Sequence, residues 1–154
     1  MNYSITQNGK PLGKSKYTID EKTKTFSSNE NDLVLDFHGL EGWTFKTGND
    51  CTFKTGYYCT FNTGGDCTFN TGGYCTFDTG SDCTFGTGSN CTFDIYDNFK
   101  SIQTKGNSNI LITNKKIHDY LEDEVIVYFE DNKLLYTENK LSKEKYKMVK
   151  ELVK

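Results

Sequence analysis

The sequence predicts a mainly β protein built around a short two-sided β-solenoid, and three observations support this fold class. First, an octapeptide reading Cys-Thr-Phe-x-Thr-Gly-x-x recurs seven times without insertion from residue 43 to residue 98. Second, the chain contains 14 Gly, 11 Phe and 10 Tyr but no Ala, a composition that favours strands and turns over a helical bundle. Third, the invariant residues of the unit alternate with variable polar residues.

This alternation predicts which side chains point into the core. In a strand, positions one, three and five share one face, and positions two and four share the other. The first face of the unit reads Cys, Phe and Thr, whereas the second reads Thr followed by a variable polar residue. We therefore expect the structural core to consist of Cys51, Phe53, Cys59, Phe61, Cys67, Phe69, Cys75, Phe77, Cys83, Phe85, Cys91 and Phe93.

Two facing units can enclose a core that one unit cannot, which predicts coils of 16 residues and two parallel sheets. Position eight supports this doubling, because Asp and Tyr alternate there through Asp50, Tyr58, Asp66, Tyr74 and Asp82. An antiparallel meander predicts the same alternation. A meander would expose a whole face of Cys and Phe side chains, whereas a solenoid covers its own core, so we favour the solenoid.

The ends of the array carry bulky apolar residues that we interpret as capping residues. Trp43 replaces Cys in the first unit, Ile95 replaces Thr in the last, and Phe99 follows at the next Cys position. We expect an N-terminal strand and hairpin cap over residues 1–42, the solenoid over 43–101, and an α+β C-terminal cap over 102–154 that ends in a basic helix.

The flanks predict further elements. Residues 17–19 and 23–26 read as a hairpin, and a degenerate unit is expected to begin at Leu35, with Phe37 at its Phe position. After the array we expect a strand at 110–113, a helical turn at 117–121, a hairpin formed by 125–129 and 134–136, and a terminal helix capped by Ser142.

Residues suited to catalysis or metal binding are sparse. His38 and His118 lie in no nucleophile or metal motif, and all six Cys occupy equivalent core positions. Their eight-residue spacing differs from the spacing of two to four residues that is typical of zinc sites. We therefore expect no catalytic residue, no cofactor and no metal site, and buried thiols with raised pKa values. A net charge of −3 favours neither a nucleic-acid nor a membrane partner.

The run CTFKTGYYCTFNTGGDCTFNTGGYCTF resembles the octapeptide-repeat proteins of phages, giant viruses and low-GC bacteria, most of them uncharacterised. The resemblance extends more loosely to the Asp36 and Phe37 entry and to the Lys-rich terminal segment. It implies a β-solenoid and a viral or mobile-element origin, and it implies no catalytic or binding residues.

We therefore expect a non-enzymatic structural or interaction module with a protein partner. Self-association could use the solenoid ends or the C-terminal helix. Because no apolar signal-peptide core is visible, we expect the protein in the cytoplasm of a host cell or in a virion. The alternative hypothesis is a solenoid that binds calcium or a thiophilic metal through its turn Asp or inward Cys residues.

Overall fold

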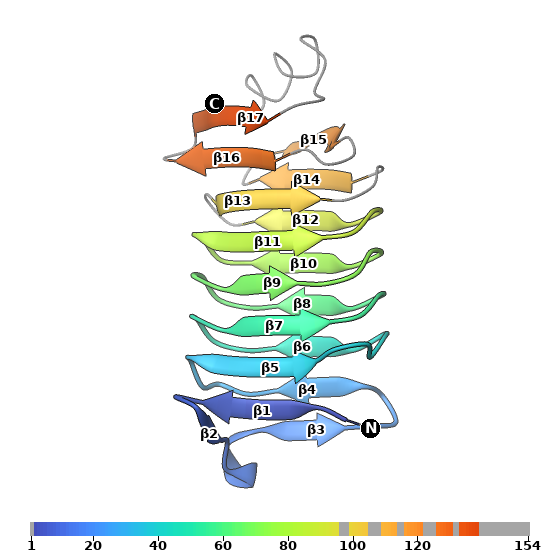
Figure 1. Cartoon of the computed structure of the whole chain (residues 1–154), viewed down its shortest axis with the longest axis vertical. Coiled ribbons are helices and arrows are strands. Elements are labelled where there is room, and N and C mark those ends of the chain that lie inside the picture. Colours follow the sequence, from blue (N-terminus) through green and yellow to red (C-terminus); the bar gives the residue numbers. More distant parts are fainter. Residues whose placement is uncertain are drawn as a thin grey trace.

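The protein is a stack of coils in the computed structural model, which describes residues 2–95, 99–104, 109–113, 116–121, 126–130 and 133–138 (Figure 1). Thr44 pairs in parallel with Thr60, and Thr52 pairs with Thr68, so one coil takes 16 residues and about five coils are stacked. Hydrogen-bonded neighbours are thus alternate octapeptides, as a solenoid requires. The predicted β-solenoid is confirmed, and the antiparallel meander is wrong for the repeat.

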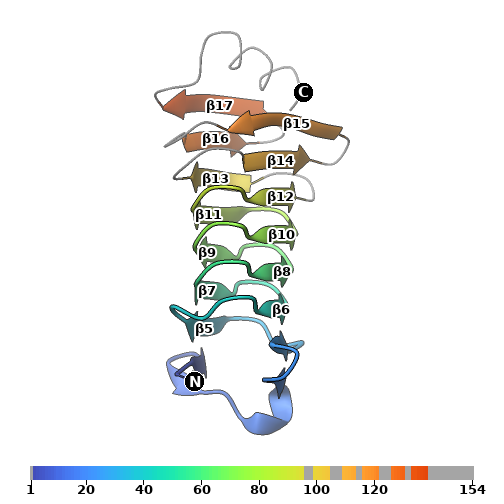
Figure 2. The ribbon, with the colours of Figure 1, turned by 90° about the vertical axis from the view of Figure 1, so that its right-hand side faces the viewer.

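Two sheets face each other across the core (Figure 2). In the described part of the chain, sheet A has nine strands in the order β17-β16-β13-β11-β9-β7-β5-β1-β2. Its strands are β1 (Ser4–Gln7), β2 (Lys10–Pro11), β5 (Leu33–Phe37), β7 (Thr52–Thr55), β9 (Thr68–Asn70), β11 (Cys83–Thr87), β13 (Phe99–Thr104), β16 (Ile126–Glu130) and β17 (Lys133–Glu138).

Sheet B has eight strands over the same described residues, in the order β15-β14-β12-β10-β8-β6-β4-β3. Its strands are β3 (Thr18–Asp20), β4 (Thr25–Ser27), β6 (Thr44–Lys46), β8 (Thr60–Asn62), β10 (Thr76–Thr79), β12 (Thr92–Ile95), β14 (Asn109–Thr113) and β15 (Lys116–Leu121). A short 3₁₀ helix, η1 (Lys14–Lys16), lies between β2 and β3.

The core is a double column of phenylalanine rings. Within one column, Phe53 stacks on Phe69 and Phe69 on Phe85, with ring centroids 5.0 Å apart and interplanar angles of 3° and 5°. Between columns, Phe69 meets Phe61 and Phe77 edge to face at 5.1 Å. Aromatic pairs in such geometries contribute about 0.5–1.5 kcal/mol beyond the burial of their area. The motif's Phe therefore supplies both the hydrophobic core and its regular order.

Glycine at position six lets the backbones of successive coils touch. A Cβ on Gly80 would lie 2.6 Å from the backbone N of Gly65, and one on Gly88 would lie 2.7 Å from the N of Gly73. The amide of Gly72 donates to the carbonyl of Gly56 at 3.1 Å. The Thr-Gly pair, present in six of the seven units, therefore marks the corner where adjacent coils pack main chain against main chain.

The coils begin before the motif does. Strand β4 pairs in parallel with β6, and β5 pairs in parallel with β7. Phe26 lies beside Phe45, and Leu35 beside Phe53, so both take the Phe position of the repeat. The expected register of the degenerate unit is therefore wrong by two residues: Leu35, rather than Phe37, takes the Phe position. The inward face was predicted correctly because a shift of two residues preserves it.

The capping assignment of Trp43 also needs correction. Trp43 is 1% exposed and lies inside the stack, with its ring 5.0 Å from that of Phe37, which belongs to the preceding coil. Ile95 and Phe99 are likewise buried, and the coils continue past them because β12 pairs in parallel with β14. The core requires apolar side chains of suitable shape, and residues that do not match the motif can supply them.

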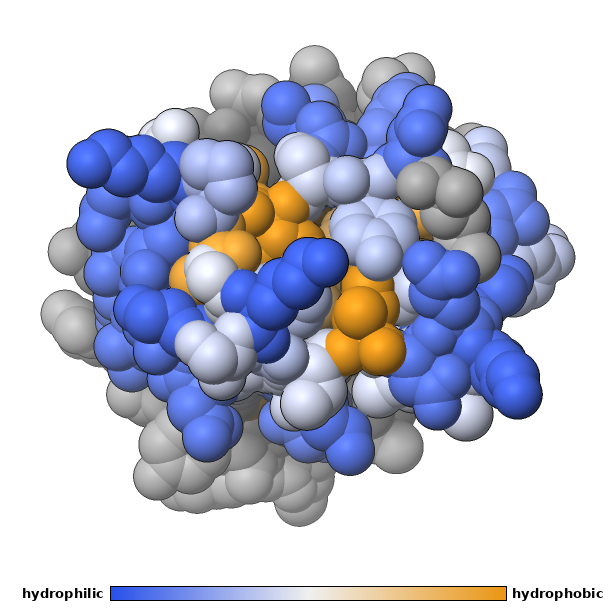
Figure 3. Space-filling view, turned by 90° about the horizontal axis from the view of Figure 1, so that it is seen from below, coloured by the Kyte–Doolittle hydropathy of each residue, from blue (hydrophilic) through white to orange (hydrophobic). Residues whose placement is uncertain are grey.

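Antiparallel strands close the N-terminal end of the stack. Strand β1 pairs antiparallel with β5, and β3 pairs antiparallel with β4, which confirms the predicted hairpin around residues 20–22. Tyr3 stacks on Phe37 at 4.8 Å, and Tyr17 stacks on Phe26 at 5.6 Å. Polar side chains surround the small apolar area at this end (Figure 3). These contacts bury a core edge that would otherwise meet water.

At the other end, β15 pairs antiparallel with β14, and β16 with β13, and β16 forms the predicted hairpin with β17. The expected helical turn at 117–121 is wrong, because these residues form β15, which supplies the hydrogen-bonding partner for the edge of β14. The described part of the C-terminal cap is therefore β structure, and the helix predicted from Ser142 lies outside the described residues.

The inward assignment can be tested in the central coil. Replacing Phe69 with Ala should lower the free energy of unfolding by about 3–5 kcal/mol, because it leaves a cavity in the ring column. Asn70→Lys, on the neighbouring outward position, should change it by less than about 0.5 kcal/mol. Chemical denaturation measures both variants. Equal tolerance at the two positions would contradict the alternation.

The two classes of glycine offer a second test. Gly80→Ala should destabilise the fold by about 1–3 kcal/mol, because its Cβ would meet the backbone of Gly65. Gly86→Ala is the matched control: its Cβ would lie 3.6 Å from the nearest atom, an ordinary contact. Ala at Gly86 should therefore be neutral or stabilise the strand by up to about 1 kcal/mol. Thermal unfolding of the two variants measures the difference in stability. A larger loss of stability in Gly86→Ala than in Gly80→Ala would contradict the prediction.

Candidate functional site

The predicted core residues are brought together in four columns, two of Cys and two of Phe. All twelve are at most 1% exposed. The thiols line the corners: Sγ of Cys67 lies 3.4 Å from the carbonyl O of Gly65 and 3.8 Å from that of Gly48, to which it can donate. In the other direction, the amide of Cys51 donates to Sγ of Cys67 at 3.4 Å. A thiol at position one thus accepts a hydrogen bond from a backbone amide that would otherwise be buried without a partner, and it lies against carbonyls that already accept hydrogen bonds between coils.

Each thiol also interacts with its neighbour in the column, and these contacts shift pKa values in opposite directions. The hydrogen bond with Cys51 lowers the pKa of Cys67, but the hydrogen bond with Cys83 and burial outweigh it and raise the pKa to about 11. The hydrogen bond with Cys75 lowers the pKa of Cys91 to about 7 despite burial, and the hydrogen bond with Cys67 likewise lowers that of Cys83. The expectation that every buried thiol has a raised pKa is therefore wrong for Cys83 and Cys91.

Position eight has a backbone role that the sequence did not reveal. Its residues adopt left-handed φ angles between 55° and 60° in every unit from Asp50 to Asn90. Asp, Asn and Gly tolerate this conformation, whereas a bulky side chain there is uncommon and costs about 1–2 kcal/mol. The corner that leads from sheet B to sheet A follows this preference, with Asp32, Asp50, Asp66 and Asp82.

The opposite corner breaks the preference and forms what we call the tyrosine corner, made of Tyr57, Tyr58 and Tyr74. Tyr58 and Tyr74 have φ angles of 60° and 57°, and their rings stack with centroids 4.9 Å apart. The three side chains are 51–59% exposed. Large aromatic side chains are thus exposed to water, and Tyr58 and Tyr74 adopt the left-handed backbone conformation that the opposite corner fills with Asp, which tolerates it better.

A hollow of about 740 Å³ adjoins the tyrosine corner on the outer face of sheet A. Its lining includes Tyr57 and the outward residues Asn70 and Gln103. Between these two amides lies Gly86, which pairs with both Asn70 and Gln103. The corner residues Gly73 and Ser89 complete the lining. We call this hollow the sheet A groove.

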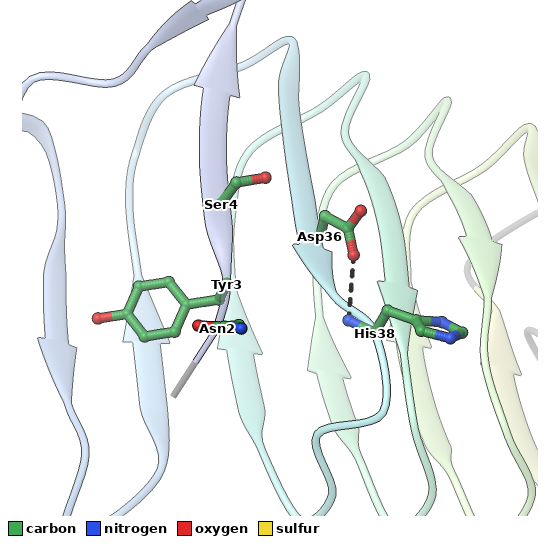
Figure 4. A pocket seen from close by; sticks show the side chains of 5 residues that line it. All are labelled: Asn2, Tyr3, Ser4, Asp36 and His38. Atoms are coloured by element: carbon green, nitrogen blue, oxygen red, sulfur yellow. Dashed lines mark hydrogen bonds between the residues drawn. The ribbon is translucent and has the colours of Figure 1, made fainter.

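A second hollow, of about 470 Å³, lies at the N-terminal edge of sheet A and is lined by Asn2, Tyr3, Ser4, Asp36 and His38 (Figure 4). Ser, His and Asp here invite comparison with a hydrolase triad. The Asp36 carboxylate, however, accepts a hydrogen bond from the backbone amide of His38 at 3.1 Å, and the imidazole points away from Ser4. The arrangement is an Asx-type turn and lacks the relay geometry of a triad.

The Asp corner does not assemble a metal site. Within the described residues, no group of three or more His, Cys, Asp or Glu side chains is arranged to hold a metal ion. The six thiols are free and buried. His118, the second histidine of the chain, lies on β15, and nothing brings it near His38 along the stack.

Comparison with known proteins adds no assignment. No protein-family model matches the chain, and neither a curated protein nor a solved structure matches it.

Sequence reasoning found the residues of the core and missed those of the two surface features. The alternation of Asp and Tyr at position eight was visible, and the signal for the corner was that Tyr replaces a residue that tolerates left-handed backbone. The signal for the sheet A groove was Gly86, which occupies position four where the other units carry Lys, Asn or Asp.

The structural role of the thiols predicts slow reactivity. The intact protein should react sluggishly with a thiol reagent because every Cys is at most 1% exposed, and the denatured protein should release six equivalents. A chelator present during refolding should leave the yield unchanged, because apolar packing and ladder hydrogen bonds need no ion. Rapid reaction of the native thiols, or chelator-induced unfolding, would contradict the structural role.

Proposed function

We propose that this chain is a non-enzymatic binding module, in which a rigid β-solenoid presents the tyrosine corner and the sheet A groove to a partner. The fold supports a structural role, because the repeat residues are absorbed by the core and by the corners. Functional specificity then depends on the outward positions that differ from one unit to the next.

The observation that carries this proposal is the exposed stack of Tyr58 and Tyr74. Both residues are more than half exposed, and both occupy left-handed backbone where Asp or Asn would cost less. The stack offsets part of this cost, by about 0.5–1.5 kcal/mol. Strain and exposed aromatic surface that folding does not require are typical of recognition sites. Tyr also offers an apolar face and a hydroxyl, which suits it to binding surfaces.

Three further points concern catalysis, metal binding and membrane-spanning helices. The turn geometry of Asp36 and His38 supports the non-enzymatic assignment, because it brings no general base to a nucleophile. The described residues offer no support for the alternative of a calcium or thiophilic-metal solenoid. In the described part of the chain, no helix has both the length and the apolar character needed to cross a membrane.

The octapeptide resemblance supports a phage or viral origin, and such an origin would place the protein in the virion or in the host cytoplasm. We retain both as part of the proposal, together with a protein partner and self-association through the solenoid ends or the C-terminal helix.

The test uses a double substitution in the tyrosine corner. Tyr58→Asn with Tyr74→Asn should leave the free energy of unfolding within about 1 kcal/mol of wild type, because relief of strain compensates for the lost stack. The matched control is Asp66→Asn with Asp82→Asn, which changes the same position at the opposite corner.

Binding is then measured with the full chain immobilised against a panel of neutral polysaccharides, acidic polysaccharides and a random peptide library. A ligand bound by wild type and by the Asp-corner control, and weakened at least tenfold in the tyrosine variant, is the expected result. Loss of more than about 2 kcal/mol of stability in the tyrosine variant would instead assign the stack to folding. Equal binding by all three proteins would also contradict the proposal.

A further inference from the structure

The sheet A groove lies where the repeat carries glycine in place of larger side chains. Gly86 is flanked in register by Asn70 on β9 and Gln103 on β13, so the outward column at position four is interrupted once. A Cβ at Gly86 would lie 3.6 Å from the carbonyl O of Phe69, so the fold leaves room for a side chain. Gly inside a strand costs about 0.5–1 kcal/mol relative to Ala. Gly86 therefore lowers the stability of the fold slightly although the packing would accept a side chain. The absent side chain leaves a recess between the amides of Asn70 and Gln103.

In the corner beside this recess, position seven also combines small residues with a large neighbour. Tyr57 is followed in the next two coils by Gly73 and Ser89, so one large ring stands next to two small residues. The ring of Tyr57 also covers the corner of the next coil, because a Cβ on Gly72 would lie 2.9 Å from its Cγ. This contact holds the ring at the edge of the recess, and the ring remains half exposed.

The lining of the groove specifies the chemistry of its ligand. The lining includes Tyr57, which is half exposed and whose aromatic ring can bind apolar C–H surface. The lining also includes the amides of Asn70 and Gln103 and the hydroxyl of Ser89, which can each donate and accept hydrogen bonds. Among the described residues that line it, none carries a charge. A charged ligand buried here would lack a counter-charge, whereas a neutral polyhydroxylated ligand would find both an aromatic platform and hydrogen-bonding partners.

We propose that the sheet A groove binds a segment of a neutral polysaccharide, with a sugar ring stacked on Tyr57 and its hydroxyls hydrogen-bonded by Asn70 and Gln103. This inference rests on the proposed binding function and assigns the sheet A groove a ligand of its own, in addition to the protein partner proposed for the module. The recess at Gly86 admits the sugar ring between the two amides, and the adjoining Tyr58–Tyr74 stack extends the aromatic surface around the corner.

The decisive variant is Gly86→Asn, which fills the recess with the side chain that neighbouring Asn70 already carries at the equivalent position. It should fold with unchanged or higher stability, and affinity for the oligosaccharide should fall at least tenfold. Tyr57→Ala, which removes the platform, should cause a similar loss. The matched control is Asp78→Asn, an exposed position-four residue on the opposite sheet, which should bind as wild type does.

The probes are defined neutral oligomers of glucose, mannose, xylose and N-acetylglucosamine, with oligogalacturonate as the acidic comparison, titrated by calorimetry into the full chain. Binding of at least one neutral oligomer, lost in Gly86→Asn and Tyr57→Ala, supports the inference. It is overturned if no neutral oligomer binds, if oligogalacturonate binds more tightly, or if Gly86→Asn binds unchanged. Tyrosine-dependent binding of a peptide without any oligosaccharide would overturn the inference and leave the proposed binding function standing.

Discussion

Register is the constraint on which the whole structure depends, because each side chain in the stack lies directly above its equivalent in the preceding coil. Parallel strands are about 4.8 Å apart, and the rings of Phe53, Phe69 and Phe85 stack at 5.0 Å, which is close to that spacing. A residue at an inward position must therefore pack well against a copy of itself. Phe does so by ring stacking, Cys by partnering backbone groups of adjacent coils, and the position-six Gly by leaving room for the neighbouring main chain. This requirement accounts for the repetition in the sequence.

The same constraint explains how far the fold could be predicted. Where register demands identical residues, the octapeptide was easy to read, and the coils, their length and their inward face followed from it. The first and last coils satisfy the same geometry with Leu35, Ile102 and Leu111, which pair with Phe positions without matching the motif. Sequence spacing does not reveal them, and the motif therefore predicts an end at Trp43 where the stack in fact continues. The spacing of Ile117 and Leu121 suits a helical turn, but the open edge of β14 requires a hydrogen-bonding partner, and this tertiary demand outweighs local preference.

The candidate site could be predicted less well, because it depends on departures from the repeat and on which departures become neighbours. Gly86 lies beside Gln103 only because a bulge after Cys83 shifts the register by one residue, an irregularity that the sequence does not announce. Likewise, Asp and Tyr at position eight read as two columns, but the left-handed backbone that makes Tyr costly there is visible only in the structure. The regular residues thus specify the scaffold, and the irregular ones carry the chemistry that distinguishes one face from another.

The central claim is that alternate octapeptides are neighbours in the sheet, since both the phenylalanine core and the sheet A groove depend on it. Gly86 gives the most direct measurement, because it is the one glycine at position four of the repeat. Nuclear Overhauser effects from its α protons should connect β11 with the backbone around Asn70 and Gln103. Contacts to Asp78 and Asp94 in the sequence-adjacent units would instead indicate an antiparallel meander and would contradict the solenoid, its core and the groove together.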